Sequence, residues 1–536
     1  MRTVSKTVIG VDFGTQSARA VLVNAENGEI LHSCRKEYPR DSAPVPAIDC
    51  VENLPCATDY EMTLYSLLHQ AVPEDYRKTV AGICVDATSM TMVLLTKDGR
   101  ALSELEEWSE AAHARVKLWK YHRAQKQADE ALNLARILKE PFLRRTGGSI
   151  SCEWMLPKLL EVRDEAPQIY AKVDLAMDLC EFLTYRLTGQ LVRSIGSLSY
   201  KCLWAEDLGF PGQTFLEGLR HGFYKEYCHF LRGDVRKPGE SAGMLRPELS
   251  KEWGFPEEIP VATGVLDGHT SLATMGAFVP GDVALIVGTS NVCTVQDQKL
   301  RELKDVCGVA QDGMITGNCG IDTGQSSTGD MLGWFIDHMT SWQVHREAEE
   351  RKLSPHQVLA GRIEKPWENK VVAVDWWSGS RNAPCNLTLQ GCMSGLDMDT
   401  RTEDIYLALL QAIACGTETI LESLSGQGVE IGRVLATGGI TKKNPLLMQE
   451  YANLLRRDVM VAKTTEGPAL GAAMFAAMAA GIYTNIGKAY EHMGIHDFIV
   501  YKPDEMHRTA YEALYRKNKS LRNMISEASA EGKNPR

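Results

Sequence analysis

The chain has 536 residues, which exceeds one ordinary hydrophobic core, so its length predicts two large domains or three small ones. Hydrophobic residues make up 44% and charged residues 24% of the chain, the composition of a soluble globular protein. The net charge of −11, without a long tract of lysine and arginine, argues against nucleic acid as a partner.

The sequence also bears on the location of the protein. Its 14 cysteines are scattered without a Cys-x-x-Cys pair, which suits reduced thiols better than a metal site. The first residues lead directly into a strand, and no apolar run reaches about 18 residues. We therefore expect no signal peptide, no membrane partner and a cytoplasmic protein.

The first motif lies in residues 7–23. An apolar run over residues 8–11 predicts a buried strand, and a second strand resumes at residue 18. The turn between them offers backbone N–H groups and hydroxyls to phosphate oxygens, and Asp12 can hold Mg²⁺ through water. Gly14 leaves room for a phosphate because it has no side chain. An ordinary hairpin would have the same pattern, so a second copy is needed to decide.

The next segments predict a helix near residues 59–72 and a buried strand over residues 80–86, followed by mainly helical structure to residue 190. Residues 86–90 follow the strand beside the first turn, where a small substrate can lie; a plain loop is the alternative. Lys201 stands among apolar neighbours. It is either a donor to sugar hydroxyls or a solvated surface lysine.

A domain boundary is predicted near residues 246–259, where Glu and Pro cluster. Asp267 follows an apolar strand in the second half of the chain, and a carboxylate at such a strand end is a candidate general base. Asp is also favoured as an N-cap, here for a helix beginning near Ser271. The residues alone leave these two interpretations equal.

The second copy of the turn motif spans residues 282–295, where Gly288-Thr289-Ser290 separates two apolar strands. Two such hairpins facing each other across a cleft can hold both ends of a triphosphate. The pairing therefore favours nucleotide binding.

The last third of the chain predicts a long helix with a capping box at Thr400 and Glu403. A later strand stops at Gly438-Gly439, and Asn444 is the predicted N-cap of the helix that follows. Residues 466–480 form a helix of small residues. Beside it, the two glycines can expose backbone to a purine ring. The chain ends in a polar, helical tail.

These motifs resemble those of the FGGY carbohydrate kinases, within the actin-like ATPase superfamily, over nearly the whole chain. Within that family the sequence is most similar to the L-ribulokinases. The supporting segments are Lys117-Leu-Trp-Lys, Gly148-Ser-Ile-Ser-Cys-Glu-Trp, Lys201-Cys-Leu-Trp, Asp267-Gly-His, Gly324-Gln-Ser and Asp375-Trp-Trp-Ser-Gly-Ser-Arg.

The resemblance implies an α/β protein with two ribonuclease-H-like domains and a central cleft that closes over ATP, Mg²⁺ and a ketopentose. The expected parts are an N-terminal domain over residues 1–258, a C-terminal nucleotide-binding domain over residues 259–500 and a helical tail over residues 501–536. The implied reaction is phosphorylation of a terminal hydroxyl, with L-ribulose giving L-ribulose 5-phosphate as the first candidate. The oligomeric state is not fixed, and a homodimer stays open.

The resemblance also implies roles for single residues. Asp267 would take the proton from the sugar hydroxyl, and Asp12 would hold the metal. The other implied contacts are Gly14, Thr15, Gln16, Gly288 and Thr289 with the phosphates, Gly438, Gly439 and Asn444 with the adenosine, and Ala87, Lys201 and Asp322 with the sugar.

Two positions depart from the ribulokinase pattern. Asp322 stands where those enzymes carry Glu, and Tyr121 replaces an Asp that would lie near the sugar. The shorter acid can lose a direct hydrogen bond to a hydroxyl or keep it through water. Another ketose or polyol, such as xylulose, D-ribulose or ribitol, therefore stays open. A nucleotide-gated binding protein without phosphoryl transfer is the alternative from a different class.

Overall fold

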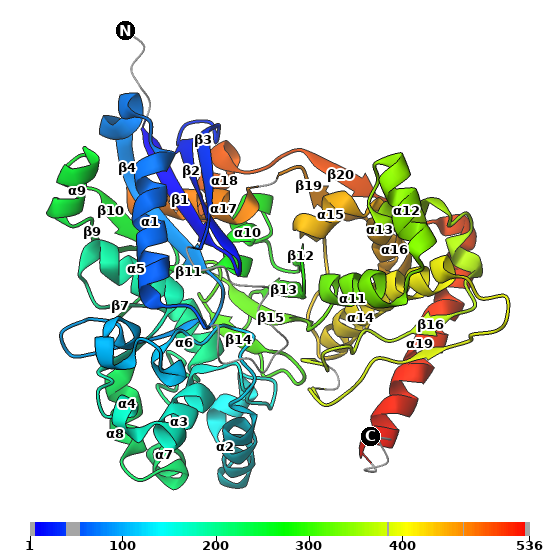
Figure 1. Cartoon of the computed structure of the whole chain (residues 1–536), viewed down its shortest axis with the longest axis horizontal. Helices are drawn as coiled ribbons and strands as arrows, with labels where there is room; N and C mark the ends of the chain where they lie inside the picture. Colours follow the sequence, from blue (N-terminus) through cyan, green and yellow to red (C-terminus); the bar gives the residue numbers. More distant parts are fainter. Residues whose placement is uncertain (1–5, 39–53, 383–384, 465, 531–536) are drawn as a thin grey trace.

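The structure is a computed structural model, which describes residues 6–38, 54–382, 385–464 and 466–530. Its framework is a pair of seven-stranded sheets (Figure 1). The first sheet has the order β3 (Ile30–Glu37), β2 (Ser17–Asn24), β1 (Thr7–Phe13), β4 (Val80–Ala87), β10 (Pro260–Ala262) and β9 (Ser241–Met244), with β11 (Val265–Leu266) also paired to β4. The second sheet has the order β14 (Gly308–Gln311), β15 (Cys319–Gln325), β13 (Asn291–Asp297), β12 (Val283–Val287), β18 (Val434–Thr437), β19 (Val459–Ala462) and β20 (Phe498–Tyr501).

The two sheets repeat one topology. In the first, β1 pairs antiparallel with β2 and parallel with β4. In the second, β12 pairs antiparallel with β13 and parallel with β18. Each predicted phosphate hairpin therefore joins the same two strands of its own sheet. This duplication confirms the α/β fold with two matched halves that the sequence predicts.

Helices α10 (Asp267–Met275) and α17 (Gly467–Ala479) lie between the sheets and share one apolar core with both of them. Glycines permit this close packing. A Cβ at Gly10 of β1 would lie 1.9 Å from the carbonyl oxygen of Ala469, and one at Gly471 would lie 2.1 Å from that of Thr270. The small-residue helix thus packs tightly against a neighbour, as the sequence predicts.

The outer faces of the sheets are covered by other helices. On the first sheet these are α1 (Ala57–Ala71) and α5 (Leu179–Thr188), and α9 (Pro247–Trp253) lies at its edge. On the second sheet and around it these are α11 (Gly329–Met339), α12 (Trp342–Arg351), α13 (Pro355–Gly361), α14 (Thr402–Gly426), α15 (Gly439–Lys443), α16 (Pro445–Leu455) and α19 (Arg508–Ala530), with the strands β16 (Val372–Ala373) and β17 (Met393–Ser394). Helix α18 (Ile486–Met493) packs on α10 and α17.

A largely helical unit with its own apolar core extends from the first sheet (Figure 1). It contains the strands β5 (Met92–Leu95), β6 (Leu175–Asp178), β7 (Val192–Ser194) and β8 (Asp234–Arg236), and the helices α2 (Gln125–Leu138), α3 (Met155–Glu165), α4 (Pro167–Tyr170), α6 (Ile195–Lys201), α7 (Gln213–Leu219) and α8 (Phe223–Phe230). Helix α6 lies against β14 of the second sheet. The helical unit therefore bridges the two halves.

Sheet membership does not coincide with the expected domain limits. Strands β10 and β11 come after residue 258 but belong to the first sheet, and α17 packs on that sheet although it lies far along the chain. The tail helix α19 packs on α14 and α16, where the Tyr511 hydroxyl donates to Glu450 at 2.9 Å.

Helix α14 begins one residue later than a cap at Thr400 and Glu403 would place it. Asp404 instead accepts the backbone N–H of Arg401 at 2.9 Å, while Thr400 bonds to Asp397.

Among the described residues, α14 alone is long and apolar enough to cross a membrane, but 83% of its most apolar stretch is buried inside the protein. It is a core helix. All cysteines that the structure describes are free thiols.

Candidate active site

Three strands of the first sheet bring carboxylates to one edge. The register pairs Asp12 of β1 with Asp86 of β4, and Leu266 of β11 with Ala87 of β4. Because parallel strands end at the same edge, Asp267, the residue after Leu266, emerges beside the first two acids.

A cavity of about 550 Å³ lies at this edge, between the first sheet, the helical unit and the second sheet. Six of the predicted site residues line it: Thr15, Lys201, Asp267, Gly288, Thr289 and Asp322. They come from both halves of the chain. The structure therefore brings both hairpins, the candidate base and two candidate sugar contacts to one cavity.

Asp267 is the first residue of α10, and Leu266 precedes it as the N-cap. It is therefore not the cap of a helix that begins at Ser271. One carboxylate oxygen of the half-buried side chain accepts the Gly268 N–H at 2.7 Å. Burial, followed by the charge of Asp12, raises the pKa of Asp267 to about 7. A carboxylate with that pKa can exchange protons near neutral pH.

Asp12 and Asp86 are both buried. Burial raises the pKa of each. The charge of Asp12 raises the pKa of Asp86 further, while Arg19, which pairs with Asp12 at 3.1 Å, and a hydrogen bond from Asp86 lower the pKa of Asp12. One oxygen of Asp86 has no hydrogen-bond partner. Paired carboxylates with an unsatisfied oxygen fit a hydrated divalent cation. Within the described ranges no group of three or more His, Cys, Asp and Glu residues could hold a metal ion.

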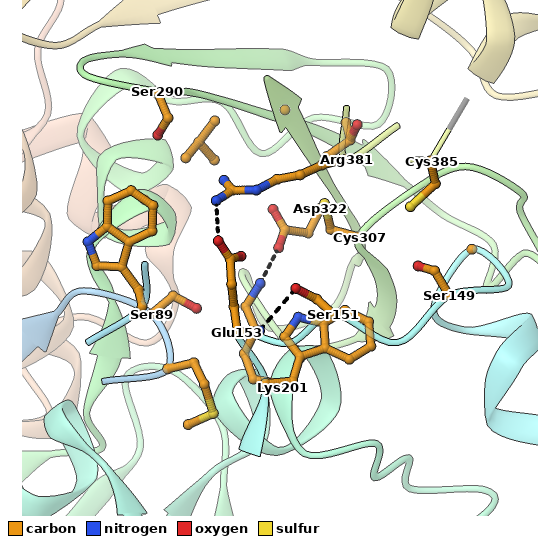
Figure 2. Close-up of a pocket in the computed structure, with 18 of the residues that line it drawn as sticks. Ser89, Ser149, Ser151, Glu153, Lys201, Ser290, Cys307, Asp322, Arg381 and Cys385 are labelled. Carbon is orange, nitrogen blue, oxygen red and sulfur yellow. Dashed lines mark hydrogen bonds and ion pairs between the residues drawn. The ribbon is translucent and has the colours of Figure 1, made fainter. Parts of the chain in front are cut away.

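Charged side chains also pair across the cavity. Lys201 Nζ lies 3.0 Å from Asp322 Oδ2, and Arg381 Nη2 lies 2.6 Å from Glu153 Oε1 (Figure 2). Burial is the largest single influence on Glu153 and raises its pKa, but Arg381 and His122 together outweigh burial and hold that pKa at about 2. Asp322 likewise raises the pKa of Lys201 against the effect of burial. Glu153, Arg381 and Lys201 are therefore charged at neutral pH.

Sequence reasoning assigned no role to Glu153, Arg381 or Trp119, although each lies in a segment that carries the family resemblance. Trp119 Nε1 donates to Thr15 Oγ1 at 3.1 Å, and the Arg381 guanidinium lies 5.6 Å from the Trp119 ring. The first hairpin is thus tied to the cavity wall. The only signal for these residues was the motifs themselves, since their partners are distant in sequence.

The interpretation of Tyr121 was wrong. The position was expected near the sugar, but Tyr121 is buried outside the cavity lining. Its hydroxyl donates to Glu161 at 2.7 Å and accepts from Lys117 at 2.9 Å, inside a buried ion pair. The departure from the family pattern at Tyr121 therefore changes the buried hydrogen bonds around Lys117 and Glu161 and leaves the cavity wall unchanged.

The remaining predicted residues lie outside the cavity lining. Gly14 closes the first hairpin through its N–H to Ser17, Gln16 is exposed at the tip, and Ala87 is fully buried while residues 88–90 line the cavity. Gly438, with φ +114°, packs on β12, since a Cβ there would lie 2.4 Å from the Val287 carbonyl oxygen. Space is open at Gly439.

Asn444 is the N-cap of α16, as the sequence predicts. Its oxygen accepts the Leu447 N–H at 3.0 Å, and its amide donates to the Tyr406 hydroxyl at 2.8 Å. The second hairpin is held by the start of α11, where the N–H groups of Thr328 and Gly329 donate to the carbonyl oxygens of Thr289 and Gly288.

The fold is an actin-like two-domain fold. It is defined by two matched sheets, by a hairpin from each sheet at one cavity, and by the helix pair α10 and α17 between the sheets. Solved structures share this fold. A xylulose kinase from Rhodospirillum rubrum gives a TM-score of 0.77 at 20% identity, covering 97% of this chain and 99% of that one. A glycerol kinase from Plasmodium falciparum with ADP gives 0.75 at 17% identity, covering 96% and 98%.

The sequence comparisons are more specific. The N-terminal domain of the FGGY family of carbohydrate kinases matches residues 7–205, and its C-terminal domain matches residues 283–480. A ribulokinase from Halalkalibacterium halodurans is 34% identical over 531 residues, which cover 96% of this chain and 94% of the relative. The chain belongs to the FGGY family of carbohydrate kinases.

Proposed function

We propose that this protein transfers the γ-phosphoryl group of ATP to the terminal hydroxyl of a ketopentose, with L-ribulose as the substrate and L-ribulose 5-phosphate as the product. The observation that carries the proposal is the placement of Asp267 in one cavity with both hairpins and with the Lys201–Asp322 pair. The relative named a ribulokinase supports the choice of sugar. Family membership argues against a binding protein without phosphoryl transfer.

In this proposal the sugar lies between Asp267 and the Lys201–Asp322 pair. The ammonium donates hydrogen bonds to sugar oxygens, and Asp322 accepts from hydroxyls. Asp267 orients the terminal hydroxyl and takes its proton late, because the transition state of phosphoryl transfer is loose. Most of the rate then comes from holding the hydroxyl in line with the γ-phosphorus.

The phosphates lie between the two hairpins. Thr15 and Thr289 contact them from opposite sides, with Gly14, Gln16 and Gly288 forming the turns. Asp12 would hold Mg²⁺ through water, and the bound cation would supply positive charge against the charge that develops on the transferred group. The adenosine lies along Gly438 and Gly439. At Gly439 no atom lies within 4 Å of the position a Cβ would take, so the backbone there is open to a flat ring.

We expect the activity to depend on pH through Asp267. The base must be ionised, and its pKa of about 7 lies well above that of an ordinary Asp. The value of kcat/KM for the sugar should therefore fall about tenfold per pH unit below 7 and level off above it. Because Asp12 contributes to the raised pKa, Asp12→Asn should move the midpoint to lower pH. The expected midpoint lies within about one pH unit of 7. A pH profile of kcat/KM without a midpoint between about pH 6 and 8 would contradict the assignment of Asp267 as the base.

The sugar is tested by measuring ADP release with ATP and Mg²⁺ on a panel of ketopentoses, ketohexoses and polyols. We expect L-ribulose to give the highest kcat/KM and ATP hydrolysis without sugar to be slow, since a kinase must keep water from the γ-phosphate. The short side chain of Asp322 is the observation in favour of a substrate other than L-ribulose, namely a different ketose or a polyol. A higher kcat/KM for xylulose, D-ribulose or ribitol would replace L-ribulose in the proposal.

A further inference from the structure

Tyr200, the residue before Lys201, fills a socket made of glycines. It is fully buried at the end of α6, which belongs to the helical unit. A Cβ at Gly308, Gly313 or Gly320 would lie 2.6, 2.7 or 2.5 Å from an atom of the Tyr200 side chain. Any larger residue at these positions would displace the ring. The three glycines all belong to the C-terminal half of the chain, so Tyr200 is a contact between the halves.

The ring is also fixed at its polar end and on one side. The Tyr200 hydroxyl donates to the Gly320 carbonyl oxygen at 2.9 Å. The His269 ring meets the tyrosine edge-on, with centroids 5.1 Å apart and an interplanar angle of 68°. His269 follows Asp267 by two residues in α10. One buried side chain of α6 therefore contacts both β15 and α10, the helix that carries the candidate base.

The socket lies directly beside the ion pair that we place in the sugar site. Gly320 and Asp322 are two residues apart on β15, so they face the same side of the sheet. Tyr200 contacts Gly320, and the next residue of α6, Lys201, contacts Asp322 at 3.0 Å (Figure 2). The pair crosses between the regions 7–205 and 283–480 that match the two family domains. Its geometry thus depends on how α6 docks on β15.

We propose that Tyr200 is a positioning residue that sets the Lys201–Asp322 pair by docking α6 on β15, an inference that rests on the proposed sugar site. A lysine has a flexible four-carbon stem, so its ammonium is placed only when the backbone beneath it is held. Helix α6 has seven residues, and Lys201 is its last. The rigid ring of Tyr200 in its close-fitting socket holds the α6 backbone in place next to Lys201.

The test compares Tyr200→Phe with Tyr490→Phe. Tyr490 of α18 is a matched control, because its ring also packs against glycines, Gly276 and Gly494, and its hydroxyl also donates to a backbone carbonyl, that of Ile495 at 3.0 Å. We expect Tyr200→Phe to raise the KM for the sugar about three- to tenfold, the effect of one neutral hydrogen bond on an equilibrium, without changing the KM for ATP. Tyr490→Phe should leave both values unchanged. An equal effect of the two variants on the sugar KM would overturn the proposal.

A second readout needs no sugar turnover. Lys201 has a side-chain exposure of 13%, so a lysine-reactive succinimide ester followed by mass spectrometry should label it slowly. We expect faster labelling of Lys201 in Tyr200→Phe and in Gly320→Ala, and no change in Tyr490→Phe. Wild-type protein that phosphorylates no sugar would refute the proposed function alone. Unchanged labelling of Lys201 in both socket variants would refute the positioning role.

Discussion

Replacing Asp267 with Asn is expected to lower kcat by about 10²–10⁴-fold, the range that a positioned general base contributes. Asparagine keeps the size of the side chain and can still face the cavity, but it cannot take the proton of the sugar hydroxyl. The loss should appear in kcat more than in the KM for either substrate, because the proton moves only as the transition state forms. Steady-state ADP release at saturating sugar and ATP measures it.

ATP binding by Asp267→Asn distinguishes a variant that has lost only its base from a variant that has not folded. Calorimetric titration of Asp267→Asn with ATP and Mg²⁺ should give an affinity close to that of the wild type, since the hairpins that contact the phosphates are unchanged. Asp207→Asn is a suitable control, as this half-exposed acid pairs with Arg145 outside the cavity at 2.9 Å. Near-normal turnover by Asp267→Asn would assign the proton transfer to another group.

Local patterns in the sequence predicted the parts of the fold that short segments determine. Both hairpins are contiguous runs of strand, glycine and hydroxyl residues, and the pairing of β1 with β2 and of β12 with β13 follows from the turns between them. Asp267 was found because an apolar strand ends directly before it. The cap at Asn444 is equally local, since Asn and Pro together mark a helix start.

Contacts between distant segments could not be read from the residues in the same way. Glu153 and Arg381 are 228 positions apart, and neither has a neighbour in sequence that indicates an ion pair. Tyr121 was misplaced for the same reason, because its partner Glu161 lies 40 positions away on α3. Sheet membership of β10, β11 and α17 also depends on packing across the molecule, which a boundary drawn from Glu and Pro content does not detect.

The second large effect is expected from Lys201→Met, which should lower kcat/KM for the sugar by at least about 30-fold. Methionine preserves much of the length of the side chain but leaves Asp322 unpaired where only 11% of its side chain is exposed. Truncating one partner of a buried, hydrogen-bonded charge pair in a binding site costs about 2–5 kcal/mol of binding free energy, and every 1.4 kcal/mol is about tenfold. The KM for ATP should change little, since Lys201 belongs to the sugar end of the cavity.

The double variant Lys201→Met, Asp322→Asn separates two causes of that loss. If the cost came only from an unpaired carboxylate, removing its charge would restore most of the activity, and the two substitutions would be strongly non-additive. We instead expect the double variant to stay at least about tenfold below the wild type, because one ammonium donor and one carboxylate acceptor for the sugar are then both missing. Asp322→Glu is the matched variant that keeps the charge and adds one methylene. It should retain the pair with Lys201 and change the ranking of sugars, so an unaltered ranking would mean that Asp322 does not contact the substrate.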